Sequence, residues 1–219
     1  MRKKLEKWIP GYARLPLICL LLVNCLVYYG SRLLTQGATR YDFSTTLDAR
    51  VPFWPVFIVF YILAYAQWFF GFIVIAREDR DTCRRVLGAE MIAKLICLVC
   101  FVALPTQMTR PEVAGGGVFS QLTRLIYRLD VPVNLFPSIH CLDSWLCFRG
   151  AQRLRRTPRW YASAMLALTL LVLASTVLVK QHVLVDIPAG ILAGEIGLFL
   201  THRLRGKRAL EEDGKEADA

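Results

Sequence analysis

Long apolar blocks alternate with short charged segments along the whole chain. Six blocks stand out, at about residues 15–33, 51–76, 86–104, 136–148, 160–179 and 183–200. Crossing a hydrocarbon core of about 30 Å takes roughly 20 residues of helix, and only the fourth block is clearly shorter and polar at its start. The pattern predicts an all-α membrane protein, a six-transmembrane-helix bundle. We expect one domain over residues 1–210 and a disordered polar tail over residues 211–219.

The only long connector lies between the third and fourth blocks, over residues 105–136. Within it, residues 118–130 carry apolar side chains at helical spacing: Leu122, Leu125, Ile126 and Leu129. A short amphipathic segment of this kind lies flat on a membrane surface. We therefore predict a helix on the outer surface of the bundle.

Composition and charge agree with a membrane protein and give it an orientation. The chain is 55% hydrophobic, its mean hydropathy is +0.43 and its net charge is +10. A basic charge can indicate a nucleic-acid partner, but here 19 of the 27 lysines and arginines lie at the N-terminus and in alternate connectors. Such a bias marks the cytoplasmic side. We expect no nucleic-acid partner, both termini in the cytoplasm and an uncleaved first span.

Two further expectations concern the membrane. Trp54, Trp68 and Trp160 lie near predicted span ends and suit an interfacial belt. The short loops and compact chain favour a bacterial plasma membrane over an organelle membrane. The oligomeric state is open.

Polar clusters beside three of the predicted spans fall on the same, extracytoplasmic side. Arg110 precedes Pro111 just after the third block, and Pro137 and Ser138 precede His140 at the start of the fourth. A helix N-terminus with proline in its first turn presents free N–H groups, which bind anions. We expect an anion site there.

The remaining cluster contains Lys180, His182 and Asp186, at the start of the sixth block. His182 and Asp186 are four residues apart, so on a helix they share one face. A carboxylate there can hold the imidazole in one tautomer and raise its nucleophilicity. His202, the third histidine of the chain, falls on the cytoplasmic side.

Arg-Pro, then Pro-Ser-x-His, then His-x-x-x-Asp, in this order across six predicted spans, resembles the type-2 phosphatidic acid phosphatase superfamily. That group includes lipid phosphate phosphatases, lipid-pyrophosphate phosphatases and sphingolipid head-group transferases. The resemblance covers about residues 106–190. It implies a lipid phosphate or pyrophosphate substrate and a phosphohistidine mechanism without metal or other cofactor. His182 would be the nucleophile, Asp186 would orient it, and His140 would protonate the leaving group.

The resemblance also implies a phosphate-binding set. Arg110 and Ser138, with backbone N–H groups near Ile139, would hold the phosphoryl oxygens, which is electrostatic positioning. The family's usual lysine, glycine and arginine are replaced here by Ala103, Ile139 and Thr176. Lys180 would supply one of the two missing cations.

These departures favour the branch nearer the sphingolipid-type transferases, so transfer of a phospho-head-group between lipids is the alternative to hydrolysis. A transporter that uses the same residues as an anion or proton path is the alternative from another class. Metal-independent, vanadate-sensitive phosphate release would indicate an enzyme, and ion flux without turnover would indicate a transporter.

Other ionisable residues within the blocks have structural interpretations. Glu90 and Lys94 are four apart, and we expect them to pair with one another. Asp143 either pairs with a cationic or histidine side chain of the clusters or favours a helix N-terminus. Glu195 is expected to form hydrogen bonds inside the bundle.

Overall fold

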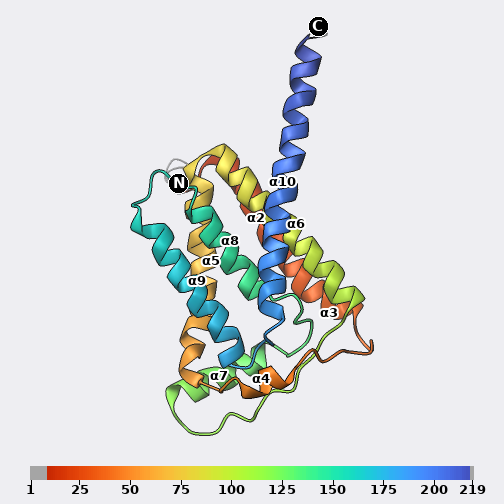
Figure 1. Ribbon diagram of the computed structural model, residues 1–219, viewed down its shortest axis with the longest axis vertical. Coiled ribbons are helices and arrows are strands. Elements are labelled where there is room, and N and C mark those ends of the chain that lie inside the picture. Colours follow the sequence, from red (N-terminus) through yellow and green to blue (C-terminus); the bar gives the residue numbers. More distant parts are fainter. Residues whose placement is uncertain (1–8, 218–219) are drawn as a thin grey trace.

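The computed structural model describes residues 9–217, with side chains described to residue 204. This part of the chain is helical and contains no strand; the only extended pairings in it are isolated bridges between outer loops. The helices pack side by side, with the short helices α4 and α7 at the end of the bundle opposite the C-terminus (Figure 1). The elements are α2 (Gly11–Cys25), the π-helix η1 (Leu26–Gly30), α3 (Ser31–Leu34), α4 (Thr46–Arg50), the 3-10 helix η2 (Pro55–Phe57), α5 (Ile58–Glu78), α6 (Arg80–Ala103), α7 (Val118–Leu129), α8 (Ile139–Ala151), α9 (Trp160–Leu178) and α10 (Asp186–Ala217).

Length and composition identify four helical segments, among the described residues, that can cross a membrane: Gly11–Leu34, Pro55–Glu78, Arg80–Ala103 and Trp160–Leu178. The all-helical membrane class is confirmed, but the six-span count is not. The 13 residues of α8 make a helix about 20 Å long, which is short of a hydrocarbon core of about 30 Å. α10 begins with a more polar sequence that contains Asp186 and Glu195.

The packing explains why α8 is polar. It contacts α5, α6, α9 and α10, and nearly all of its side chains are buried against them. Figure 1 shows it between α9 and α10. Leu142 and Leu146 of α8 are fully buried in the main core cluster, which also contains Phe72 of α5 and Leu87 of α6. Because protein rather than lipid surrounds α8, its sequence can carry the polar residues that a lipid-facing helix would not tolerate.

A close approach of α10 to α8 brings two parts of the predicted site together. A side chain at Gly190 would collide with the carbonyl oxygen of Ser138 and with Cys141. Small residues allow such close backbone contact between membrane helices. The Ser138 N–H consequently donates to the carbonyl oxygen of Asp186 at 3.2 Å.

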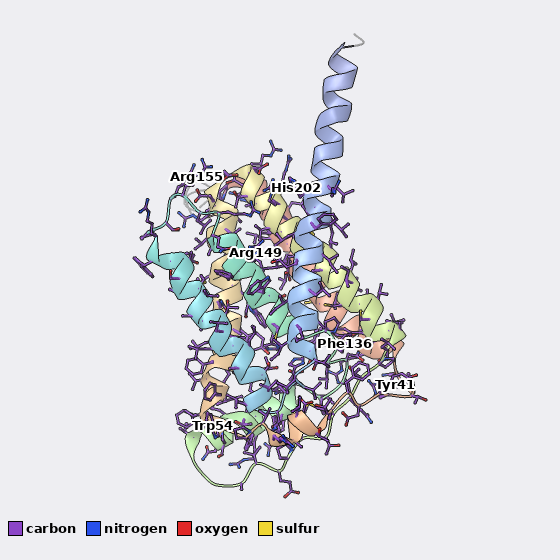
Figure 2. All side chains as sticks on the ribbon, in the orientation of Figure 1. Tyr41, Trp54, Phe136, Arg149, Arg155 and His202 are labelled. Atoms are coloured by element: carbon purple, nitrogen blue, oxygen red, sulfur yellow. The ribbon has the colours of Figure 1, made fainter. Side chains whose placement is uncertain are left out.

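The basic and aromatic residues labelled in Figure 2 lie towards different ends of the bundle. Arg149, Arg155 and His202 lie at one end, and Trp54 and Phe136 lie towards the other (Figure 2). This arrangement fits the charge bias, while the sidedness in a membrane stays a prediction. The basic N-terminal residues and positions 218–219 lie outside the described residues. α10 runs as helix to Ala217, across most of the segment for which we predicted a disordered tail; the domain boundaries are not tested.

The amphipathic helix is confirmed, its position on the outer side of the membrane stays a prediction, and one part of the aromatic belt is wrong. α7 matches the amphipathic helix predicted at residues 118–130, with Leu122 and Ile126 packed inward and Leu125 exposed. Trp160 is exposed at the start of α9, as a belt residue would be. Trp68 instead lies within α5, and its indole N–H donates to Ser144 Oγ at 2.9 Å. The hydrogen bond to Ser144 on α8 therefore orients this indole towards the inside of the bundle.

The buried ionisable residues form pairs. Lys94 Nζ lies 3.4 Å from Glu90, as expected, and 2.8 Å from Asp143. Asp143 therefore pairs with a lysine of α6 rather than with the clusters at the outer end. Glu195 lies 2.8 Å from Arg149 Nε and accepts the indole N–H of Trp145 at 2.8 Å. These contacts give α8 charged links to α6 and α10.

Candidate active site

His182 and Asp186 form a buried pair at the start of α10. His182 Nδ1 lies 3.0 Å from Asp186 Oδ2, and the two residues are 8% and 0% exposed. The predicted pairing is present, but the predicted helical face is not, because α10 begins at Asp186 and His182 lies in the turn before it. Asp186 Oδ2 also accepts the Val183 N–H at 3.1 Å, which caps the turn from within. One carboxylate therefore fixes both the ring and the loop.

The end of α9 holds the other side of this loop. The N–H groups of Gln181 and His182 both donate to the carbonyl oxygen of Thr176, at 2.9 and 3.0 Å. Lys180 adopts a left-handed backbone conformation, with φ of 52°, which reverses the chain between α9 and the loop. Thr176 replaces the family's arginine, and its side chain is fully buried. The main chain of Thr176 therefore shapes the loop, and this position contributes no cation.

His140 lies in the first turn of α8, facing His182. Ser138 is the N-cap, and its hydroxyl accepts the Cys141 N–H at 3.3 Å. Pro137 precedes this cap, so it is not in the first helical turn as predicted. The N–H groups of Ile139 and His140 belong to the first turn, where no intrahelical acceptor exists. The ring centroids of the two histidines are 6.0 Å apart.

Aromatic rings of α5 surround the imidazole of His140. Tyr61 stacks on it with centroids 4.1 Å apart and planes 22° apart, while Trp68 and Tyr65 present edges at 4.8 and 5.5 Å. His140 is 8% exposed, and no described residue offers a hydrogen bond to its Nε2. This nitrogen is therefore a buried polar atom without a hydrogen bond. Such atoms are rare in native structures and usually have a functional or structural reason.

Arg110 joins the connector to the site. Its guanidinium donates to the carbonyl oxygen of Asp130 at 2.6 Å and to Gln181 Oε1. It also lies over the ring of Tyr127, 4.6 Å from the centroid. The Nε atom is buried and has no hydrogen-bond partner among the described residues. Arg110 is thus held beside the loop of His182 by neutral acceptors, and the carboxylate of Asp130 is a nearby negative charge.

Lys180 points towards α4. Its ammonium donates to the carbonyl oxygens of Asp48 and Val51, at 2.9 and 2.6 Å. Burial lowers the pKa of Lys180, and the nearby Asp48 opposes this shift. The side chain of Asp48 in turn accepts the Leu184 N–H at 2.6 Å. Although burial favours its protonated form, the bonds from Thr45 and Leu184 hold the pKa of Asp48 below its usual value.

Two cavities meet at His182. The larger, about 410 Å³, is mainly apolar and includes Tyr28, Trp68, Phe101 and both histidines in its lining. The smaller, about 330 Å³, is lined by Arg110, Lys180 and His182 together with hydroxyl groups from the segment that includes α4. His182 therefore stands between a mainly apolar space and a space lined by two cationic side chains and by Asp48.

Sequence reasoning missed several residues that complete this arrangement. Gln181 and Asp130 hold Arg110, Asp48 holds the loop, and Tyr61 holds His140. The spacing of Tyr61, Tyr65 and Trp68 places their side chains on one face of α5, and this pattern could have been noticed. For the others the sequence gives no comparable signal, since their contacts join segments far apart in the chain.

The fold and the clustered residues define a helical membrane protein with two histidines and an arginine at one end of its bundle. A family model described as the PAP2 superfamily matches residues 42–200, and the chain belongs to this family. The match confirms the resemblance to type-2 phosphatidic acid phosphatases and supports a phosphatase-type activity. Comparisons with curated proteins and with solved structures found no significant match.

Proposed function

We propose that the protein is a lipid phosphate or pyrophosphate phosphatase that works through a phosphohistidine. The observation that carries this proposal is the position of His182. Its Nδ1 is tied to Asp186, its ring lines both cavities, and its Nε2 has no hydrogen bond to a described residue. A carboxylate-held imidazole with one free nitrogen is suited to nucleophilic attack on phosphorus.

The first half-reaction would form a bond between His182 Nε2 and phosphorus and break the bond from phosphorus to the lipid oxygen. His140, on the side of the apolar cavity, would give its proton to that oxygen. In the second half-reaction His140 would take a proton from water, which attacks phosphorus and releases phosphate and neutral His182. Asp186 would stabilise the charge that His182 gains in the phosphorylated state.

Phosphate binding would fall to groups on both sides of His182, because Arg110 lines the polar cavity whereas Ile139 and His140 line the apolar one. Arg110 supplies a cation with a free buried Nε, and the N–H groups of Ile139 and His140 supply a helix N-terminus. Ser138 contributes through its cap, because its hydroxyl is fully buried and engaged with Cys141. Lys180 lines the polar cavity together with Arg110. To bind phosphate, its ammonium would have to exchange a carbonyl oxygen for a phosphoryl oxygen.

The substrate class follows from the other cavity. Its apolar lining suits the hydrocarbon part of a membrane lipid, and its inner wall carries His140, where the leaving oxygen would be protonated. The nucleophile would lie between this space and the polar one. We therefore propose that the lipid approaches from the membrane and that phosphate leaves on the extracytoplasmic side.

Purified protein in detergent provides the test. Phosphate release would be measured from phosphatidate, prenyl pyrophosphate and phosphatidylglycerophosphate, with and without excess EDTA and vanadate. We expect turnover that survives EDTA and is inhibited by vanadate. His182→Ala should be inactive and His202→Ala, at the opposite end of the bundle, should match wild type. Loss of turnover in EDTA with recovery on adding magnesium would contradict the metal-free mechanism.

Transfer to an acceptor alcohol is a second candidate. The polar cavity beside His182 has a volume of about 330 Å³, which is far more than a water molecule needs. An alcohol that binds there could take the phosphoryl or head group in place of water. Turnover of a labelled phospholipid in liposomes, with and without an added lipid alcohol, distinguishes the two. A labelled lipid product in place of free phosphate would indicate transfer.

A further inference from the structure

His140 and His182 are oriented by different means. His182 has a carboxylate on one ring nitrogen, whereas His140 is the only one of the two whose Nε2 is buried without a hydrogen bond among the described residues. The torsion that turns an imidazole about its stem has a broad energy profile, so a ring without a polar partner needs neighbours to fix its plane. For His140 the closest such neighbour is the stacked ring of Tyr61, which is itself fully buried.

Tyr61 is fixed in turn by Asp130. Its hydroxyl donates to Asp130 Oδ2 at 2.9 Å, and the hydroxyl of Tyr28 donates to Oδ1 at 3.0 Å. The backbone carbonyl oxygen of the same aspartate accepts the guanidinium of Arg110 at 2.6 Å. One residue at the end of α7 therefore contacts both the support of His140 and the arginine of the phosphate site.

We propose that Tyr61 is a positioning residue for His140 and that Asp130 couples this ring to Arg110. The proposal rests on the proposed function, because it assigns His140 an oriented proton transfer. The stacked phenol fixes the plane of the imidazole without occupying either nitrogen. The lone pair or proton of Nε2 thus stays available to the leaving oxygen. The face of an electron-rich ring also favours the imidazolium that forms when His140 takes a proton from water.

Asp130 links the position of Tyr61 to the position of Arg110. Because its side chain holds Tyr61 and its main chain holds Arg110, a shift of α7 would move the acid and the phosphate clamp together. Proton transfer requires both to be in place at once, since a positioned acid must lie within hydrogen-bond reach of the oxygen that leaves. This link explains why an outer helix with an exposed apolar face also carries a carboxylate that accepts two tyrosine hydroxyls.

The test separates the ring of Tyr61 from its hydroxyl. Tyr61→Leu removes the stack, Tyr61→Phe keeps it and removes the bond to Asp130, and Tyr161→Phe on α9 is the matched control for loss of a tyrosine hydroxyl. We expect Tyr61→Leu to lower kcat for a lipid monoester about a hundredfold, with KM nearly unchanged and a pyrophosphate affected only a few-fold. Tyr61→Phe should lose less than Tyr61→Leu but remain measurably below wild type, and Asp130→Asn should resemble Tyr61→Phe, because each weakens only the bond that couples the ring to Arg110. An equal loss on both substrates, or equal losses in Tyr61→Leu and Tyr61→Phe, would overturn the proposal.

A measurement without turnover keeps this result distinct from a failure of the proposed function. In full-length protein carrying His182→Ala and His202→Ala, His140 is the only histidine, so its ring protons can be assigned directly by NMR in detergent. Stacking on Tyr61 should shift these protons upfield, and Tyr61→Leu should remove the shift while Tyr61→Phe keeps it. Unshifted ring protons in the parent protein would show that the stack is absent, whatever the enzyme assays give. A shifted ring in this variant, combined with a wild-type protein that turns over no lipid phosphate, would leave the stack in place and refute the proposed function, and with it the role of the stack in proton transfer.

Discussion

The ring centroids of His182 and His140 are 6.0 Å apart, and the two rings have surroundings of opposite kinds. A carboxylate and the carbonyl oxygen of Thr176, which accepts the His182 N–H, define the position of His182, whereas aromatic rings of α5 define that of His140. A nucleophile needs one fixed tautomer, which a carboxylate secures. An acid that later acts as a base needs a nitrogen free to gain and lose a proton, and stacking provides orientation without taking up that nitrogen.

The largest expected effect comes from removing His182 or the charge of its partner Asp186. His182→Ala should abolish turnover of monoesters and pyrophosphates alike, because no phosphohistidine can form. Asp186→Asn keeps the shape of the carboxylate but not its charge, and it should lower turnover on the order of 10²- to 10⁴-fold. Acid-quenched, base-stable phosphoprotein from radiolabelled substrate reports the intermediate. If label persists in His182→Ala and vanishes in His140→Ala, the two roles are exchanged. If no variant and no wild-type sample carries label, water attacks phosphorus directly.

The effect of removing His140, which is surrounded by aromatic rings, should depend on the leaving group of the substrate. A lipid alkoxide leaves poorly without a proton, whereas the lipid monophosphate that leaves from a pyrophosphate needs one much less. His140→Ala should therefore lower monoester cleavage roughly 10²- to 10⁴-fold and pyrophosphate cleavage far less. Phosphoenzyme should accumulate, since the activation of water is impaired too. Rates on both substrate types, measured beside His202→Ala, check this. Equal losses on the two substrates would remove the distinction between acid and nucleophile.

The helical parts of the fold were the most predictable. The apolar blocks coincide with α2 to α3, α5, α6 and α9, because helices that face lipid must be apolar along their length. The start of α10 and the whole of α8 were harder to assign, because protein surrounds α8 and relaxes the demand for apolar side chains. Trp68 shows the same limit, since an indole near the predicted end of a span turned inward to a partner on α8.

In the site, the sequence located the groups that we propose react but not those that hold them. Arg110, His140, His182 and Asp186 stand in recognisable local patterns, and the structure brings them to one end of the bundle. Their supports come from distant segments: Tyr61 lies 79 residues before His140 in the chain, and its contact depends on how α5 packs against α8. Nothing in local spacing encodes such a contact.

Removing Arg110, which we propose binds phosphate, should give the next largest loss of activity. Arg110→Ala removes a cation whose partners are neutral carbonyl oxygens and an amide, and the cost should be on the order of 10²- to 10³-fold in kcat/KM on both substrate types. Arg110→Lys should recover only part of the lost kcat/KM. An ammonium lacks the forked donors of a guanidinium and cannot contact Asp130, Gln181 and phosphate at once. Steady-state kinetics with both substrates test this. A loss confined to monoesters would place Arg110 with the acid rather than with the phosphate.

Lys180 should give the smallest effect of the set, because it anchors a loop and also lines the polar cavity. Its ammonium already binds the carbonyl oxygens of Asp48 and Val51, so Lys180→Ala should lower turnover about tenfold, as expected for a lost charge-assisted contact of about 1.5 kcal/mol. Lys180→Arg should keep most activity. Burial lowers the pKa of Lys180, so the wild-type ammonium is lost as pH rises through this lowered value, whereas a guanidinium keeps its charge. The alkaline fall in turnover should therefore begin at lower pH in wild type than in Lys180→Arg. Identical alkaline limbs, together with wild-type kinetics for Lys180→Ala, would show that this lysine serves neither His182 nor phosphate.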